Sequence, residues 1–249
     1  MGGEDDSRTG QRPHRVLYGR RTGRPLSRAR RALVETLLPR LDIDLPDGRF
    51  DPAALFSFDP REVWLEIGFG GGEHLAAQAR ANPDVGLIGC EPFIDGVARL
   101  LADVEAGRLR NIRLFRDDAR LLLDRLADDT LARAFILFPD PWPKLRHHKR
   151  RIVAPGPLRS LARVLRDGAE LRIATDDSGY KEWILHHVLA DGAFRWTARG
   201  PADWRTRPAD WPATRYEAKA VAAGRRPAYF AFRRGHGQRA GVVTTPQRA

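Results

Sequence analysis

The chain of 249 residues contains a single cysteine, Cys90, so it can form no disulfide bond within itself. A metal site built from several cysteines is excluded for the same reason. Its apolar runs fall well short of the roughly 18 residues that a membrane-spanning helix needs. The first residues, MGGEDDSRTGQRPHR, lack the apolar core of a secretory signal. We therefore expect a soluble, cytoplasmic protein that does not enter a membrane.

Lysine is also scarce. Only four of the 43 basic residues are Lys, and the chain carries 32 acidic residues, which gives a formal net charge of +11 at pH 7. Such an excess of positive charge attracts polyanions and speeds their encounter with the protein. An arginine-rich codon usage would produce the same total without functional meaning. Only the positions of the basic residues can therefore indicate a function.

Strand-like and helix-like segments alternate along the chain. Ser27 is suited to cap a helix over residues 27–41, where apolar residues recur at helical spacing. Strands are predicted at 63–70, 85–92, 111–118, 132–140 and 169–177, with helices over 73–82, 95–107 and 119–128 between the first four. Residues 193–200 and 227–235 resemble a closing antiparallel pair at the sheet edge. This order predicts an α/β fold, an open and mostly parallel sheet with helices on both faces.

The two ends of the chain lack hydrophobic periodicity. Residues 1–26 are polar and rich in Gly and Arg, which predicts a mobile basic arm. Residues 236–249 are interpreted as a disordered tail. One domain over residues 27–235 remains between them.

Ligands of such sheets bind beyond the carboxyl ends of the parallel strands. The residues at these five predicted ends are the glycine stretch 68–72, Glu91, Asp118, Asp140 and Asp176. Four of the five ends carry a carboxylate. Each acid alone is more often a solvated strand end or a helix cap, but acids at successive strand ends favour one shared ligand.

The first strand leads into the loop LEIGFGGGEH, residues 65–74. Glycines such as Gly68 and Gly70 allow a tight turn and a close approach of the backbone to a ligand. A dinucleotide fingerprint would require Gly at position 73, where the chain has Glu73. Glu66 within the strand would repel a pyrophosphate and attract an ammonium group. A nicotinamide oxidoreductase is therefore the least favoured interpretation.

The next two strand ends suit a nucleoside. Glu91 lies about 20 residues after the glycine loop, where a carboxylate pairs with ribose hydroxyls. Asp118 could reach an adenine amino group. A nucleoside with a cationic amino-acid end and no phosphate fits these acids, and S-adenosylmethionine is such a molecule.

The fourth strand ends at Asp140, which lies between Pro139 and Pro141 in a backbone of fixed φ. Trp142 is interpreted first as a wedge that holds this loop against the sheet. A dense basic run follows, and no acid occurs from residue 142 to residue 165. A solvated helix face would mix charges of both signs, so the run favours contacts with phosphates. The adjacent histidine pairs 147–148 and 186–187 lack metal-ligand spacing, so no metal is expected.

Six motifs follow one another in a recognisable order: EIGFGGGEHL, GCEP, RDDA, FPDPWPKLRHHKRRIV, ATDD and TRYE. From about residue 64 to residue 233 the chain resembles the bacterial tRNA (guanine-N7-)-methyltransferase family. The fourth motif is highly specific, whereas many methyltransferases share the glycine loop. The departures from the pattern are mild: Leu145 and His148 within the basic run, and a very Arg-rich N-terminal arm.

The resemblance implies a Rossmann-like class I methyltransferase with a seven-stranded sheet, S-adenosylmethionine as cofactor and a guanine in the variable loop of tRNA as substrate. It implies Asp140 as the catalytic residue. The cofactor-binding residues that it implies are Glu66, Gly68, Gly70, Glu91, Asp118 and Asp140. The substrate-binding residues that it implies are Lys144, Arg146, His147, His148, Lys149, Arg150, Arg151, Asp176, Thr214, Arg215, Tyr216 and Glu217.

Two alternatives remain open at this point. The chain could be a methyltransferase that acts on an exocyclic amine, whose D/N-P-P-aromatic loop PDPW matches in part. It could also be a non-catalytic RNA-binding module that retains the fold. A monomer and a homodimer are equally compatible with the basic arm.

Overall fold

Seven strands form one sheet in residues 21–190 and 192–235, the part of the chain that the computed structural model describes. Their order across the sheet is β3-β2-β1-β4-β5-β7-β6. The strands are β1 Glu62–Ile67, β2 Val85–Cys90, β3 Ile112–Phe115, β4 Leu131–Leu137, β5 Leu165–Thr175, β6 Phe194–Trp196 and β7 Ala228–Arg234. The pairs among β1 to β5 are parallel, and β7 is antiparallel to both β5 and β6. The predicted mostly parallel α/β sheet is confirmed, with the antiparallel strand one place in from the edge.

Helices follow the strands as the alternation predicts. Ser27 caps α1, because its hydroxyl accepts a hydrogen bond from the Arg30 amide, and Asp118 caps α4 through the Arg120 amide. The α-helices are α1 Arg28–Thr36, α2 Glu73–Ala81, α3 Ile94–Gly107, α4 Ala119–Arg125, α5 Pro155–Val164, α6 Ser178–Leu189, α7 Ala202–Arg205 and α8 Arg215–Ala222. The 3₁₀ helices are η1 Leu38–Arg40, η2 Pro52–Leu55 and η3 Leu145–Arg150.

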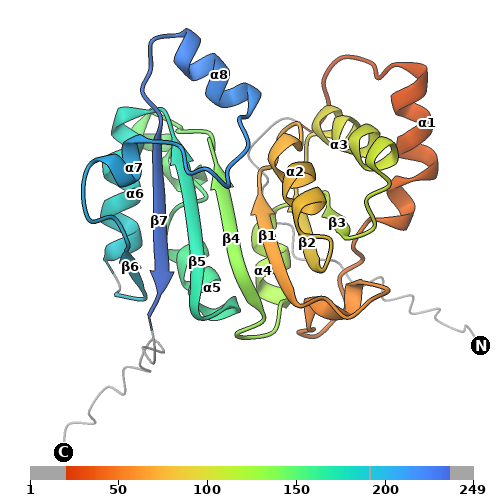
Figure 1. Ribbon diagram of the computed structural model, residues 1–249, viewed down its shortest axis with the longest axis horizontal. Coiled ribbons are helices and arrows are strands. Elements are labelled where there is room, and N and C mark those ends of the chain that lie inside the picture. The colour runs from red at the N-terminus through yellow and green to blue at the C-terminus, as the bar shows by residue number, and fades with distance from the viewer. Residues whose placement is uncertain (1–20, 191, 236–249) are drawn as a thin grey trace, which may run out of the picture.

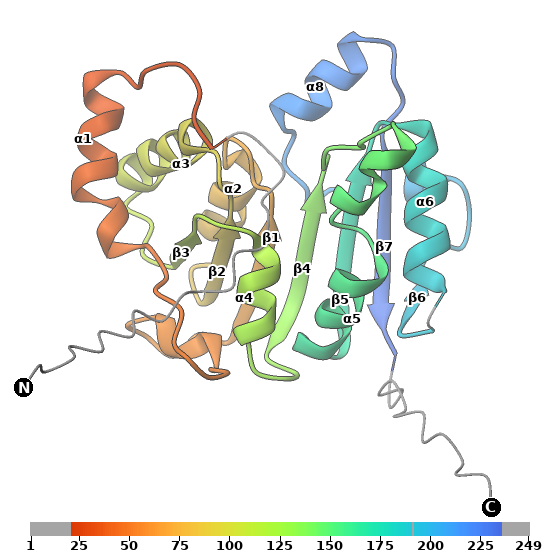
Figure 2. The ribbon, with the colours of Figure 1, turned by 180° about the vertical axis from the view of Figure 1, so that it is seen from behind.

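The helices cover both faces of the sheet (Figures 1 and 2). Alternate side chains of each strand point to opposite faces, so each face has its own core. One core joins the sheet to α4, α5 and α6 through residues such as Leu122, Leu161 and Ile184. The other joins it to α2 and α3 through Leu75, Leu100 and their neighbours, with α1 packed on α3.

On the face of α2 and α3, a loop covers the strands that no helix reaches. The chain between α7 and α8 crosses the front of β7 and β5 (Figure 1). Trp211 of this loop is buried, with its ring 5.6 Å from that of Tyr229 on β7. Asp210 holds the loop down by an ion pair of 2.6 Å with Arg172 of β5. We call residues 206–214 the covering loop.

The strand order reverses between β1 and β4, which run side by side but lead to helices on opposite faces. At such a switch point the loops after the two strands separate and leave a crevice at the carboxyl edge. The strands end two to three residues earlier than the sequence predicted, so Gly68, Glu91, Asp118 and Asp140 lie in loops beyond the sheet. The switch point therefore brings the glycine loop opposite the Asp140 loop.

The predicted tail, residues 236–249, and most of the predicted arm, residues 1–20, lie outside the described residues. Residues 21–26 lie against the domain. The carbonyl of Arg21 accepts a hydrogen bond from the Ile94 amide, and its guanidinium lies 3.0 Å from Asp117. None of the described helices is both long and apolar enough to cross a bilayer.

Candidate functional site

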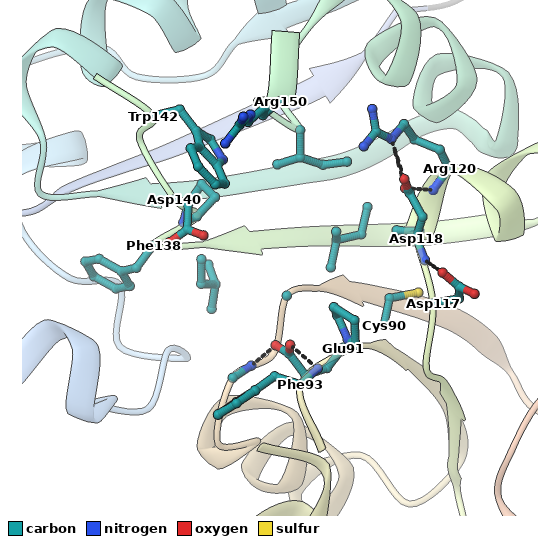
Figure 3. A pocket seen from close by; sticks show the side chains of 18 of the residues that line it. Cys90, Glu91, Phe93, Asp117, Asp118, Arg120, Phe138, Asp140, Trp142 and Arg150 are labelled. Carbon is teal, nitrogen blue, oxygen red and sulfur yellow. Dashed lines mark hydrogen bonds and ion pairs between the residues drawn. The ribbon is translucent and has the colours of Figure 1, made fainter. Parts of the chain in front are cut away.

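A cavity of about 790 Å³ lies at the switch point (Figure 3). This volume is within the range of small-molecule and cofactor sites, roughly 300–1,000 Å³. The loops after β1, β2, β3 and β4 all contribute to its wall. The wall includes seven residues that the sequence predicted for the site, namely Gly68, Gly70, Glu91, Asp118, Asp140, Arg150 and Tyr216.

The glycine loop forms one side of the cavity. Gly68 has φ 74°, and a Cβ built on it would have no protein atom within 4 Å, so its backbone borders open space. Gly70 has φ 58°, and a Cβ there would lie 2.6 Å from the ring of Tyr216 on α8. Both conformations favour glycine. The loop thus exposes its backbone to a ligand at Gly68 and lies against α8 at Gly70.

Glu91 joins the glycine loop to α3 (Figure 3). Its two carboxylate oxygens accept hydrogen bonds from the Gly70 amide at 2.8 Å and the Phe93 amide at 3.0 Å. Burial raises the pKa of Glu91, the two amides lower it, and the neighbouring carboxylates of Asp140 and Glu66 raise it again. Three acids therefore lie close enough to repel one another, which favours a cationic ligand.

Asp118 lies at the opposite end of the cavity from the glycine loop. Its carboxylate is buried and accepts from Arg120 Nε at 2.8 and 3.0 Å. Asp117 lines the same wall and accepts from the Asp118 amide and from Arg21. An acidic end of the wall is thus partly neutralised by two arginines. Sequence reasoning found Asp118 but not Asp117 or Arg120.

The loop after β4 is strained on both sides of Asp140. Phe138 has φ 51° and Trp142 has φ 44°, values that bulky side chains rarely adopt and that cost on the order of 1–3 kcal/mol each. Asp140 between them is exposed, and in the described part of the chain no hydrogen bond or ion pair engages its carboxylate. Strain of this kind occurs at functional sites. The loop holds a free carboxylate at the cavity.

Trp142 and Arg150 close the cavity above Asp140 (Figure 3). The Arg150 guanidinium lies 4.8 Å from the centre of the Trp142 ring, a cation–π contact. His147 packs edge-on against the same ring at 5.9 Å. Trp142 therefore fixes part of the basic run as well as its own loop, which extends the predicted role of a wedge.

Arg151 departs from its predicted role. The sequence placed it among the RNA-contacting residues, but its side chain is buried, 5% exposed. Its Nε donates to the Pro141 carbonyl at 2.7 Å, and its guanidinium lies over the rings of Tyr180 and Trp183. A buried guanidinium cannot present its charge to a phosphate. Arg151 instead ties the Asp140 loop to α6.

The remaining basic run lies outside the cavity, on η3. Lys144, Arg146 and Lys149 are exposed, as phosphate contacts require. His148 is half-buried against Trp183 at 4.9 Å. The run thus forms a basic surface beside the mouth of the cavity, with its two histidines packed against aromatic rings.

The predicted substrate residues near α8 are mostly engaged with protein groups. Asp176 pairs with Arg225 at 2.8 Å, and Arg215 lies 3.4 Å from Glu73. The Thr214 hydroxyl caps α8 by accepting from the Glu217 amide. The Glu217 carboxylate accepts from Tyr229 Oη at 2.5 Å and pairs with Arg207 at 3.1 Å.

Of this group, only Tyr216 lines the large cavity. Tyr216 is also 42% exposed, so its side chain is available to a ligand in the cavity. In this conformation Asp176 and Glu217 do not offer free carboxylates to a base.

Glu66 lies next to the large cavity. It lines a small adjoining one together with His74, Thr214 and Tyr216, and its carboxylate is 2.8 Å from His74 Nδ1. Gly68 and Tyr216 border both spaces. Within the described ranges no group of three or more His, Cys, Asp and Glu side chains is arranged to hold a metal ion.

Sequence reasoning missed several residues of the wall, among them Phe93 and the thiol of Cys90, whose pKa burial raises. Both flank Glu91 within two positions. Proximity to a predicted strand end was the signal that could have identified them.

Comparison with known proteins agrees with this geometry. A family described as "Putative methyltransferase" matches residues 60–229. The chain is 56% identical to a tRNA (guanine-N(7)-)-methyltransferase of Rhodospirillum rubrum, over 88% of this chain and 87% of that protein. It is 51% identical to a protein of the same name from Paramagnetospirillum magneticum, over 93% and 97%. The crystal structure of the 16S rRNA methyltransferase KamB shares the fold, with a TM-score of 0.52 at 18% identity, over 71% of this chain and 89% of that one.

Proposed function

The chain belongs to the tRNA (guanine-N(7)-)-methyltransferase family, and on that premise we propose that its cavity holds S-adenosylmethionine while the cavity mouth receives a guanine of tRNA for methylation at N7. The observation that carries the proposal is the convergence of Glu91, Asp118 and Asp140 on one cavity beside the glycine loop. We propose residues 27–235 as the methyltransferase domain.

The residues present fit this cofactor. The backbone at Gly68 borders open space where any side chain would intrude, as a closely held ligand requires. Glu91 would hold the ribose hydroxyls, because a carboxylate that accepts two amide hydrogens still has lone pairs for further donors. Asp118 and its neighbours would hold the adenine, and Glu66 the ammonium group. Carboxylates outnumber arginines around the cavity, which suits a cationic ligand.

S-adenosylmethionine supplies an electrophilic methyl group on a sulfonium. Guanine N7 has a free lone pair at neutral pH, so no residue of the chain has to remove a proton from it. What the chain supplies is alignment of the two reactants, worth roughly 7–11 kcal/mol in well-oriented pairs. The strained loop at residues 138–142 and the packed ring of Trp142 provide such rigidity.

We assign to Asp140 the stabilisation of the positive charge that develops on the purine ring during transfer. A carboxylate held in a fixed position near the developing charge is effective in this role. Two observations support Asp140 over Asp176 and Glu217. Its carboxylate has no partner among the described residues, whereas Arg225 engages Asp176 and Tyr229 engages Glu217.

The exposed cations of η3 would hold the phosphates that flank the target base. Lys144, Arg146 and Lys149 are exposed and belong to the same basic run as Arg150, which lines the cavity with Asp140. Their contribution should fall steeply with ionic strength, as phosphate contacts do. The guanine itself has to turn toward the cavity, because structured RNA keeps its bases stacked. We place this guanine in the variable loop and expect a cytoplasmic monomer or homodimer.

The decisive experiment is incubation of the purified protein with unmodified tRNA and S-adenosylmethionine carrying a labelled methyl group. Nuclease digestion and mass spectrometry then locate the label. Methylation at guanine N7 is the expected result. A label on an exocyclic amine would overturn the proposed acceptor atom, and calorimetry without cofactor binding would favour a non-catalytic RNA-binding module.

A further inference from the structure

A buried carboxylate and a buried imidazole meet beneath the glycine loop. Glu66 at the end of β1 is 3% exposed, and His74 in the first turn of α2 is 2% exposed. His74 Nδ1 lies 2.8 Å from Glu66 Oε2. Burying a carboxylate is costly unless hydrogen bonds or a cation compensate it. The state of the imidazole therefore decides how much charge this site holds.

The neighbouring hydrogen bonds identify that state. Gln78, one turn further along α2, places its Nε2 atom 2.7 Å from the carbonyl oxygen of Asp210. A carbonyl only accepts, so this atom is the amide nitrogen. The same nitrogen lies 3.3 Å from His74 Nε2 and directs a hydrogen toward it. His74 Nε2 is then the acceptor, and Nδ1 carries the proton that is donated to Glu66.

The pair therefore holds one net negative charge, on Glu66, with a neutral imidazole beside it. In the described ranges no arginine or lysine pairs with Glu66. The carboxylates of Glu66 and Asp140 both act on Glu91, whose pKa they raise. A purely structural position would be served as well by an apolar residue of similar volume. A buried charge beside a cavity, with a hydrogen bond but no cationic partner in the described ranges, instead suits a cationic group of a ligand.

The same hydrogen bonds lead to the covering loop. Gln78 donates to Asp210, and the ring of Trp211 lies 6.3 Å from that of His74. Three residues further along, Thr214 caps α8 and brings Tyr216 to the cavity wall. The cofactor side and the α8 side are thus joined by a continuous series of contacts from Glu66 through His74 and Gln78.

We propose that His74 is a positioning residue that orients Glu66 toward the ammonium group of the cofactor. Through Gln78, His74 also couples this contact to the covering loop, which leads into α8 on the side where the tRNA would bind. The inference rests on the proposed function and goes beyond it. No residue of α2 belongs to the motif positions assigned above to cofactor or substrate.

The first test compares two His74 variants in calorimetry without RNA. His74→Phe keeps a planar ring but cannot donate to Glu66, and His74→Asn places an amide nitrogen near the position of Nδ1. We expect His74→Phe to weaken S-adenosylmethionine binding about tenfold, or ~1.4 kcal/mol, and His74→Asn to bind within about threefold of the wild type. Binding of 5′-methylthioadenosine, which lacks the amino-acid end, should be unchanged in both variants.

Equal weakening by both variants, or equal weakening for both ligands, would mean that the imidazole only fills space, and would overturn the inference. Should His74→Phe not fold, His74→Leu provides the same test, because leucine also fills the buried site and has no group to donate to Glu66. Loss of S-adenosylmethionine affinity with retained 5′-methylthioadenosine affinity is again the expected result.

The second test concerns the coupling. Gln78→Leu should raise the KM for tRNA about fivefold, the lower end of couplings between sites, and should raise the KM for S-adenosylmethionine as well, because a coupling acts on both ligands. Arg80→Gln on the exposed side of α2 is the matched control and should change neither value. An unchanged KM for tRNA in folded Gln78→Leu would refute the coupling. If the wild type binds S-adenosylmethionine but methylates another acceptor, the proposed function fails while the calorimetric test of His74 still stands.

Discussion

Arg151 offers a test of the structure against the sequence pattern, because the two assign it different roles. In Arg151→Met the chain loses a charged hydrogen bond of 2.7 Å to Pro141, and such bonds contribute about 1.5–3 kcal/mol. It also loses cation–π contacts with Tyr180 and Trp183, each about 0.5–2 kcal/mol. Methionine packing recovers part of this. We expect the free energy of unfolding to fall by about 3 kcal/mol.

The matched control is Lys149→Met, two positions earlier in the same basic run and exposed. Its unfolding should be unchanged within about 0.5 kcal/mol, as for surface substitutions in general. Its tRNA affinity should fall, and the slope of log affinity against log salt concentration should decrease by about one, as for a lost phosphate contact. Arg151→Met should keep the wild-type slope, because its guanidinium lies away from solvent.

Urea unfolding and filter binding at several salt concentrations measure both quantities. A structural role of Arg151 is refuted if Arg151→Met unfolds like the wild type and shows the reduced salt slope. It is also refuted if Lys149→Met is the destabilised variant.

Three further predictions follow from the cavity wall. Asp140→Ala should lower kcat by a factor of roughly 10²–10³, with near-normal binding of tRNA and cofactor. An unchanged rate in single-turnover assays would show that Asp140 has no role in methyl transfer. The pKa of Glu91 is raised above its ordinary 4.5, so Glu91 loses its charge at a higher pH than a free carboxyl group does. Cofactor affinity, measured by calorimetry, should therefore decline as the pH is lowered through that raised pKa. Glu91→Gln should abolish this decline. Gly70 has φ 58°, and a Cβ there would lie against Tyr216, so Gly70→Ala should weaken cofactor binding by about 1–3 kcal/mol. Adding Tyr216→Ala should restore part of the lost affinity. If it restores none, backbone strain alone is responsible for the loss.

The fold could be predicted from the sequence because most buried strands contain a short apolar run and several helices begin at a capping residue. Ser27 and Asp118 act as caps, as their positions before amphipathic segments indicate. The covering loop could not be predicted, since its burial depends on Arg172 and Tyr229, which are far from it in the sequence.

The candidate site was predicted in outline for a related reason. The carboxyl ends of parallel strands meet at one edge, so Glu91, Asp118 and Asp140 could be grouped without coordinates. The contact partners of individual side chains could not be predicted in this way, because strand ends do not indicate them. The burial of Arg151 depends on Tyr180 and Trp183, about 30 residues later, and within a run of cations it looked like its exposed neighbours.

The antiparallel direction of β7 has a practical consequence for handling the protein. Because β7 runs against the parallel strands, its last residue, Arg234, lies at the end of the sheet opposite the cavity. Arg21, by contrast, pairs with Asp117 in the cavity wall. A fluorophore attached at residue 235 should therefore leave turnover intact, whereas the same group attached at residue 21 would lie beside the cavity wall, at the end where we propose that the adenine binds.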